Sequence, residues 1–205
     1  MTNIETTELA RSLREATPSD EQAARVAERV AALAAEHGLA DVAYATTDTP
    51  FGQLLLATTP RGLVRVAFPS ERHDDVLADL AARLSPRILE APAQLDEARR
   101  ELDEYFERER REFDLPLDWR LSRGFRSKVL HNIARIPYGE TATYAEMAAE
   151  AGSPTAYRAA GSACGSNPIP LVVPCHRVVA TGGGLGGYGG GVELKEYLLR
   201  FEGAL

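Results

Sequence analysis

The sequence predicts an α+β protein in two parts, a part built around a sheet followed by a mainly helical part. Three runs of apolar and β-branched residues, 41–47, 52–59 and 62–68, are separated by "DTPFG" and "TPRG", as in a β-meander. After residue 119 the apolar residues recur with helical spacing instead. With 205 residues, the chain is long enough for one large domain or two small ones.

An N-terminal extension, residues 1–40, is expected to hold one helix. Ser19 and Gln22 have the spacing of a capping box, and Gly38 is typical of a helix end, which predicts a helix over 19–38. The apolar stripe of this helix consists of Val26, Val30 and Leu33. The polar residues 1–18 before it are expected to be frayed.

The meander belongs to a predicted small α+β domain, residues 41–118. "SERHDDVLADLAARL", from about Ser70, and "AQLDEARRELDEYFERER" have the pattern of amphipathic helices. "EFDLPLD", residues 112–118, is expected to form an edge strand. The domain should therefore combine a sheet with two helices.

The last part, residues 119–205, is predicted to be helical and to contain a helix-turn-helix. The predicted helices are "FRSKVLHNIARI", "TATYAEMAAEAG", "SPTAYRAAGSACGS" and "VELKEYLLRFEG". Thr141 or Thr143 would cap the second helix and Gly152 would end it, while Ser153 and Pro154 fit the N-cap and N1 positions of the third. The third helix could enter a DNA groove. A plain helical hairpin is the alternative explanation of the same spacing.

The overall charge of −7 does not exclude DNA, because it is unevenly distributed. Residues 1–120 hold 15 Lys and Arg against 24 Asp and Glu, a net charge of −9, whereas residues 121–205 hold 8 against 6, a net charge of +2. No apolar run approaches the roughly 18 residues of a membrane span, and no secretory signal is evident. Two cysteines and four scattered histidines predict neither a disulfide scaffold nor a metal site. A cytoplasmic monomer is expected.

A nucleophilic cysteine is the main chemical prediction. "LVVPCHRVVA" places Cys175, His176 and Arg177 together after a proline that favours a turn. A thiol reacts as the thiolate, so it needs a base, and a histidine base usually needs a third group to orient it. Glu193, Glu196 and Glu202 are equivalent candidates for that group on residue pattern alone. A buried structural cysteine is the alternative for Cys175, and a small packing residue is the expectation for Cys164.

These motifs together resemble a known family. "NPIPLVVPCHRVV", with the helix-turn-helix before it and "GGLGGYGGG" and "LKEYLLRFEG" after it, is similar to the O6-alkylguanine-DNA alkyltransferases, or methylated-DNA–protein-cysteine S-methyltransferases. The resemblance covers residues 41–205 and is most specific over 138–205. It implies a ribonuclease-H-like first domain. It also implies stoichiometric transfer of an alkyl group from O6-alkylguanine in double-stranded DNA, with minor-groove binding, base flipping and no metal or cofactor. O4-methylthymine could be a further substrate.

The resemblance also assigns roles to individual residues. Cys175 would accept the alkyl group, His176 would take the thiol proton through water, and Glu202 would orient His176. Asn167 would hold the turn, Tyr144 would donate a proton or hydrogen bond to the leaving guanine, and Lys195 would stabilise charge in the pocket. Arg158 would fill the gap left by the flipped base. The remaining residues with implied contacts are Ala156, Ala159, Gly161 and Ser162, with Tyr144, at DNA, and Val178, Tyr188, Gly189 and Cys164 around the base. Arg177 is expected to tie the segment to the neighbouring domain.

Two other functions remain open at this stage. One is a lesion sensor or regulator that binds alkylated DNA without repairing it. The other is a cysteine hydrolase that uses Cys175, His176 and Glu202 on a small acyl substrate. The helix over 19–38 lies ahead of the resemblance and has no assigned role. Zinc ligands found in the first domain of some animal members have no counterpart in this sequence.

Overall fold

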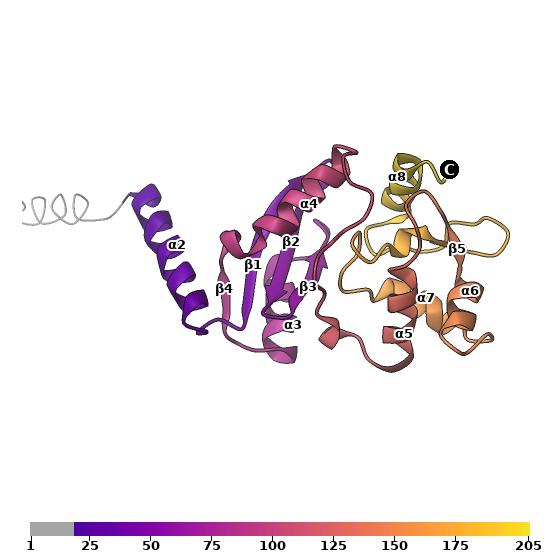
Figure 1. The fold of residues 1–205 in the computed structure, drawn as a ribbon, viewed down its shortest axis with the longest axis horizontal. Coiled ribbons are helices and arrows are strands. Elements are labelled where there is room, and N and C mark those ends of the chain that lie inside the picture. The colour runs from indigo at the N-terminus through magenta and orange to yellow at the C-terminus, as the bar shows by residue number, and fades with distance from the viewer. Residues whose placement is uncertain (1–18) are drawn as a thin grey trace, which may run out of the picture.

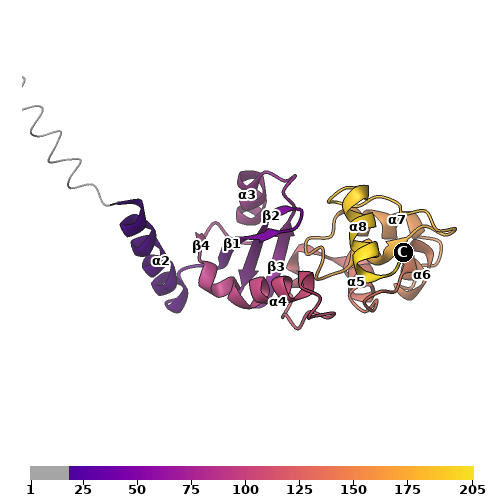
Figure 2. The ribbon, with the colours of Figure 1, turned by 90° about the horizontal axis from the view of Figure 1, so that it is seen from above.

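The computed structural model describes residues 19–205 and has the predicted α+β architecture. The expectation for residues 1–18 lies outside this range. A helix, α2 (Asp20–Glu36), precedes a sheet domain, and a helical domain follows it. The two domains lie side by side, with α2 on the far side of the sheet domain from the helical one (Figure 1, Figure 2). No helix within residues 19–205 is long and apolar enough to cross a bilayer.

The predicted meander is confirmed as three antiparallel strands. They are β1 (Val42–Thr49), β2 (Gly52–Thr59) and β3 (Gly62–Ala67). A short strand that the sequence did not predict, β4 (Ile88–Glu90), pairs parallel with β1 and gives the sheet order β3-β2-β1-β4. The edge strand expected over 112–118 is wrong. That segment makes a single bridge, between Leu63 and Leu117, because Pro116 cannot donate to a strand ladder.

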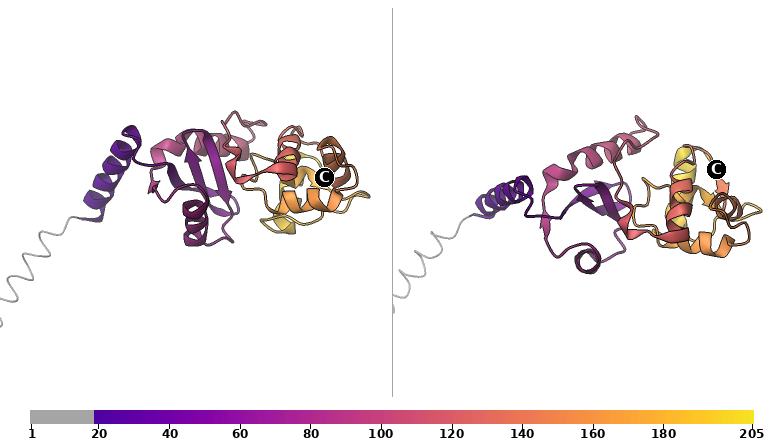
Figure 3. Two further views of the ribbon diagram at one scale, coloured as in Figure 1. Left: turned by 90° about the horizontal axis from the view of Figure 1, so that it is seen from below. Right: turned by 60° about the horizontal axis from the view of Figure 1, so that its bottom comes forward.

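Both faces of the sheet are covered, which explains the continuous apolar run in β2. Leu54 and Leu56 face the helix α4 (Asp96–Phe106), which follows a 3₁₀ turn at Pro92–Leu95. Leu55 and Ala57 alternate with them and contact the helix α3 (His73–Arg83). The two helices lie on opposite sides of the sheet (Figure 3). Strands buried on both faces are apolar throughout rather than alternating.

The second domain contains the four predicted helices, with some of their boundaries shifted. They are α5 (Gly124–Ile133), α6 (Tyr144–Glu150), α7 (Tyr157–Gly165) and α8 (Val192–Glu202). Thr143 caps α6 in a capping box, and Gly152 follows the helix with a φ of 85°. Ser153 and Pro154 do not begin α7, so that prediction is wrong. The Ser153 carbonyl accepts from the Ala156 amide and closes a turn, which delays the helix to Tyr157.

The helix α2 forms as predicted but buries little of its apolar stripe. The Gln22 amide donates to Ser19 Oγ at 3.2 Å, and the Ser19 amide donates to Gln22 Oε1 at 3.0 Å, as in a capping box. Val26, Val30 and Leu33 remain exposed, whereas Ala31 packs with Ala43 and Ala91 on the sheet domain.

Candidate active site

A buried 3₁₀ turn, Cys175–Arg177, carries the predicted nucleophile. It follows Pro174, ends an apolar run and leads into the short strand β6 (Val178–Val179), which pairs with β5 (Ala142–Thr143). All three residues of the turn are at least 95% buried. A strand would point Cys175 and His176 to opposite faces. The turn instead keeps both inside the domain.

Asn167 joins the segment before the turn to the thiol. Its Nδ2 donates to the Val173 carbonyl at 2.8 Å and lies 3.1 Å from Cys175 Sγ, while its Oδ1 accepts from the Ile169 amide at 3.1 Å. Burial raises the pKa of the Cys175 thiol to about 11, although the Asn167 contact and Lys195 oppose that rise. The resting group is therefore a neutral thiol at pH 7, and it needs a base to react.

His176 is held in one tautomer by Glu202. Its Nε2 lies 3.0 Å from Glu202 Oε1, and an ionised carboxylate can only accept, so Nε2 carries the proton. Nδ1 then holds a free lone pair, and it is buried without a partner among residues 19–205. Burial lowers the pKa of His176, which keeps the ring neutral. Burial alone would raise the pKa of Glu202, but hydrogen bonds from His176 and Arg177 bring it down to about 2.

Arg177 belongs to the cluster around His176 and Glu202, and the hydrogen bonds of its guanidinium lie within the second domain. Its Nε donates to Glu202 Oε2 at 2.8 Å, its Nη2 to Glu202 Oε1 at 2.9 Å, and its Nη1 to the Ile136 carbonyl at 2.5 Å. The expectation that Arg177 ties this segment to the neighbouring domain is wrong, because all these acceptors lie in its own domain. The first domain reaches the cluster through Tyr105 of α4, which the sequence did not suggest. The Tyr105 hydroxyl donates to Glu202 Oε1 at 2.6 Å.

Lys195 is fully buried rather than solvated. Its Nζ donates to the Val178 carbonyl at 2.5 Å and to the Leu185 carbonyl, so it ties α8 to both ends of the segment after the turn. The ammonium also lies 5.7 Å from the centre of the Tyr144 ring. Burial lowers the pKa of Lys195. Val178 is buried as well and contributes its carbonyl oxygen to this contact.

A cavity of about 300 Å³ between the two domains reaches the thiol. Cys175 lines it from the turn, Asn167 from the segment before the turn, Cys164 from α7, and Tyr188 and Gly189 from the glycine-rich loop. Both cysteines are free thiols, and burial raises the pKa of Cys164 to about 12.

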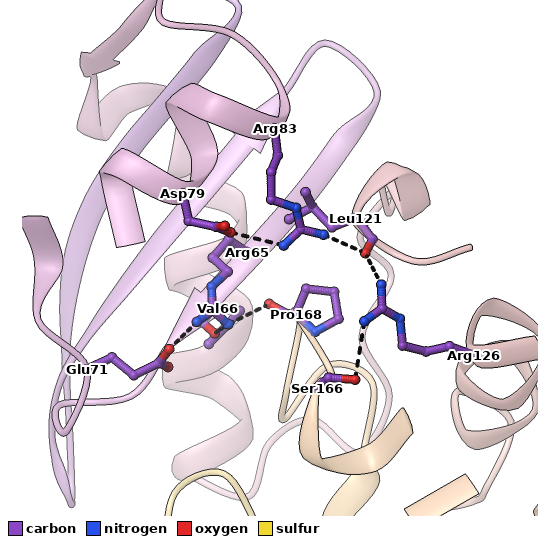
Figure 4. A network of polar contacts seen from close by, with 9 residues as sticks. All are labelled: Arg65, Val66, Glu71, Asp79, Arg83, Leu121, Arg126, Ser166 and Pro168. Atoms are coloured by element: carbon purple, nitrogen blue, oxygen red, sulfur yellow. Dashed lines mark hydrogen bonds and ion pairs between the residues drawn. The ribbon is translucent and has the colours of Figure 1, made fainter. Parts of the chain in front are cut away.

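A network of polar contacts between the domains, which we call the polar seam, lines this cavity opposite Cys175 (Figure 4). It is built around Arg65, Arg83 and Arg126. Arg65 pairs with Glu71 and donates to the Pro168 carbonyl at 3.4 Å. Arg83 and Arg126 both donate to the Leu121 carbonyl at 2.9 Å. The sequence did not indicate these arginines. Arg65 and Arg83 donate to main-chain carbonyls 103 and 38 residues away, and Arg126, five residues from Leu121, shares the acceptor of Arg83. The seam holds the first domain against the segment that contains Asn167.

A second cavity, of about 370 Å³, lies between α7 and the glycine-rich loop. It is lined by Tyr144, Gly161, Gly165, Gly186, Gly187, Tyr188 and Gly189. Gly165, Tyr188 and Gly189 also line the first cavity, so the two adjoin. Burial raises the pKa of Tyr144 to about 12, and its hydroxyl therefore keeps its proton at neutral pH. Tyr188 and Gly189, which the resemblance implies around the base, line both cavities.

Gly186→Ala should impair this second cavity. Gly186 has a φ of 69°, and a Cβ there would come within 2.5 Å of the Tyr144 hydroxyl. The tyrosine would have to move, and a displacement of about 1 Å can cost on the order of 10²-fold in rate. The resemblance implies alkyl transfer from DNA to Cys175, and we expect this transfer to slow by at least tenfold in the variant, measured by single-turnover kinetics on alkylated DNA.

Gly184→Ala is the matched control for that variant, because Gly184 lies in the same loop outside the lining of both cavities and a Cβ there would meet only the Ala180 side chain, at 3.7 Å. It should retain the wild-type rate. Equal rates for the Gly186 variant and wild type would contradict the assignment of this cavity.

Residues of α7 predicted to contact DNA lie on its outer face. Arg158, Ala159 and Ser162 are exposed, and Ala156 and Gly161 are half-buried. The Arg158 guanidinium lies 5.7 Å from the Tyr157 ring centre, and Tyr157 is exposed as well. Small side chains beside one long cation allow the helix backbone to approach a ligand closely. No cluster of metal-ligating side chains is found within residues 19–205.

Asn167→Ala should destabilise the site measurably. It would leave the buried Ile169 amide without its partner, whereas the Val173 carbonyl would still accept from the Cys175 amide at 2.8 Å. An unsatisfied buried polar group costs roughly 1–3 kcal/mol, so we expect a loss of that size in the free energy of unfolding. Chemical denaturation checks this. Asn132→Ala, on the half-buried side of α5, should change stability by less than about 1 kcal/mol, and an equal loss in both variants would contradict the role of Asn167.

Comparisons with known proteins agree with this geometry. The ribonuclease-like domain of 6-O-methylguanine DNA methyltransferases matches residues 42–119, and the DNA-binding domain matches residues 124–204. The constitutive methylated-DNA–protein-cysteine methyltransferase of Bacillus subtilis is 39% identical over 160 residues, which are 78% of this chain and 94% of that protein.

Solved structures of methyltransferases also match this chain over both domains. The O6-methylguanine methyltransferase of Mycobacterium tuberculosis is 38% identical with a TM-score of 0.68, covering 80% of this chain and 93% of its own. A structure of the M. tuberculosis protein in complex with DNA aligns with the same TM-score and covers 79% of this chain. The ribonuclease-like first domain and the DNA-binding second domain are thereby confirmed. The chain belongs to the 6-O-methylguanine DNA methyltransferase family.

Proposed function

We propose that this chain is a methylated-DNA–protein-cysteine methyltransferase that repairs O6-alkylguanine in DNA with Cys175 as the sacrificial acceptor. Its family and the names of its relatives make direct-reversal DNA repair its function. The observation that carries the assignment of Cys175 is the buried thiol next in sequence to His176, whose Nδ1 has no partner in the described part of the chain and whose Nε2 is held by Glu202.

The cluster supplies the base for thiol activation. His176 Nδ1 takes the Cys175 proton through a water molecule, and Glu202 stabilises the imidazolium that forms. The sulfur then attacks the alkyl carbon in line. The S–C bond forms as the C–O6 bond breaks, and the electron pair of that bond leaves on O6. Tyr144 donates a proton or hydrogen bond to the departing guanine, and the proton on His176 returns through solvent. The thioether does not hydrolyse readily, so each chain acts once.

The remaining predicted residues have positioning roles in this proposal. Asn167 holds the turn, and Lys195 holds the carbonyls of Val178 and Leu185 around the base. Tyr188, Gly189 and Cys164 wall the cavity that reaches Cys175.

Recognition of DNA is assigned to α7 of the helix-turn-helix. Its small outer residues, Ala156, Ala159, Gly161 and Ser162, enter the minor groove, and Arg158 fills the space of the flipped nucleotide. Flipping costs a few kcal/mol and is cheapest for a weakly paired, damaged base. The protein acts as a monomer in the cytoplasm.

A single mass measurement tests the proposal. The protein is incubated with a duplex oligonucleotide that carries O6-methylguanine, and its intact mass is then determined. We expect the mass of one methyl group per chain and no second turnover. A lesion that is bound but unchanged would instead indicate a sensor, and repeated turnover of an ester without DNA would indicate a cysteine hydrolase.

A further inference from the structure

We propose that Tyr105, a residue of the first domain, is a positioning residue that lowers the basicity of His176 through its hydrogen bond to Glu202. Activation of the thiol would then depend on contact between the two domains. This inference rests on the proposed function of Cys175 and His176, and it adds a role in the reaction for the ribonuclease-like domain.

Tyr105 is held rigidly at the domain boundary. It is 1% exposed, and its ring packs among Phe106, Phe113, Tyr138 and Phe201 with centroid separations of 5.0 to 6.1 Å. Its hydroxyl donates to Glu202 Oε1 at 2.6 Å. Burial beside the Glu202 carboxylate raises the pKa of Tyr105, so the hydroxyl stays protonated and remains a donor. It is the one donor to Glu202 that the first domain contributes within residues 19–205.

The Tyr105 hydroxyl and His176 use the same carboxylate oxygen. Oε1 of Glu202 accepts from Tyr105 at 2.6 Å, from Arg177 Nη2 at 2.9 Å and from His176 Nε2 at 3.0 Å. Oε2 accepts from Arg177 Nε alone among the described donors. Each donor disperses negative charge on the oxygen that it contacts, and the phenol makes the shortest contact. Less charge is then available to stabilise a protonated His176.

Removal of the hydroxyl should therefore raise the pKa of His176. The other titratable or charged groups near the pair stay in place. They are Arg177 and Tyr138 near Glu202, and Arg177, Lys195 and Tyr188 near His176. With a higher pKa, His176 becomes protonated at a pH where the wild-type ring is still a free base. Only the neutral ring can accept the thiol proton.

Tyr105→Phe tests this through the pH dependence of methyl transfer. Loss of one of the three donors to Oε1 returns negative charge to the oxygen that His176 contacts, so the acid limb of the single-turnover rate should move to higher pH by roughly half to one pH unit. The rate on the high-pH plateau should stay within twofold of wild type. A purely structural role for Tyr105 would instead lower the rate equally at every pH. Coincident acid limbs, or a uniform loss, would overturn the proposal.

Two variants serve as controls. Tyr44→Phe removes another phenol of the first domain that lies beside a carboxylate, Glu90, away from the site, and it should leave the acid limb unchanged. 3,5-Difluorotyrosine at position 105 keeps the ring and donates more strongly, so it should move the limb to lower pH. A limb that does not move with this residue would count against the proposal even if Tyr105→Phe folds poorly.

A titration without DNA separates this inference from the proposed function. The pKa of His176 is read by NMR of the labelled imidazole in wild type and in Tyr105→Phe. Absence of methyl transfer with a shifted imidazole titration would refute the proposed function alone. Methyl transfer with an unshifted titration would refute the role of Tyr105 alone.

Discussion

Cys175→Ser should abolish methyl transfer completely while leaving the lesion bound. A serine hydroxyl is a far weaker acid than a thiol, and His176, whose pKa burial lowers, is too weak a base to ionise it. The substitution is nearly isosteric in a site that already places a hydrogen-bond donor, Asn167 Nδ2, 3.1 Å from the sulfur. The fold and the DNA-binding helix should therefore be retained.

Intact mass and DNA affinity check this prediction together. Wild-type protein gains one methyl group, which peptide mapping should place on Cys175, whereas the variant gains none and still shifts lesion-bearing DNA in a binding assay. Cys164→Ser is the matched control, since Cys164 lines the same cavity as a free thiol with a pKa raised by burial. The Cys164→Ser variant should still gain one methyl group, on Cys175. Methylation of the Cys175 variant would refute the assignment of the acceptor.

Local sequence patterns predicted the elements whose structure depends on residues that are neighbours in the chain. The meander follows from β-branched runs ended by glycine and proline, and the caps at Ser19 and Thr143 follow from side chains that satisfy amides three residues on. The strand β4 could not be predicted in this way. It has only three residues and exists through its pairing with β1, more than 40 residues earlier. The start of α7 was misplaced because Ser-Pro fits both a helix cap and the turn that it forms here.

The site shows the same division between local and distant contacts. Cys175 and His176 were evident from adjacent residues, and the motif context selected Glu202 over Glu193 and Glu196. The burial of Lys195 was not evident, because its acceptors, Val178 and Leu185, come from a separate segment. Tyr105 had no local indication either, since it lies 97 residues from Glu202. Residues that act through a partner distant in sequence need the fold before they can be recognised.

Glu202→Gln should slow methyl transfer by about 10²–10⁴-fold, the effect expected when a histidine base loses the carboxylate that holds its tautomer. The amide has no charge to stabilise an imidazolium. It can also donate to Nε2, which would place the ring proton on Nδ1, where the thiol proton has to go. Single-turnover kinetics checks the rate. Glu196→Gln is the matched control, because Glu196 lies on the same helix and pairs only with Arg200 among the described cations. It should transfer at the wild-type rate.

The same substitution should destabilise the protein in a manner that depends on pH. Glu202 has a pKa of about 2 in the folded protein and 4.5 as its ordinary value, because donors from His176 and Arg177 outweigh the effect of burial. A lowered folded-state pKa stabilises the protein above pH 4.5, and this stabilisation is lost as the pH falls toward 2. Its size is roughly 3 kcal/mol at pH 7. Loss of the carboxylate also leaves the Arg177 guanidinium buried without its ionic partner.

Denaturation of wild type and Glu202→Gln should therefore differ most near pH 7 and converge between pH 4.5 and pH 2. In that interval Glu202 becomes protonated in the unfolded chain while it stays ionised in the folded protein down to about pH 2, so the stabilisation that its charge provides is lost progressively. A difference in stability that stays constant from pH 7 to pH 2 would show that Glu202 is not ionised in the folded protein. Nε2 of His176 would then have no charged acceptor. Nothing would keep the ring proton on Nε2, so Nδ1 would lose the lone pair that accepts the thiol proton.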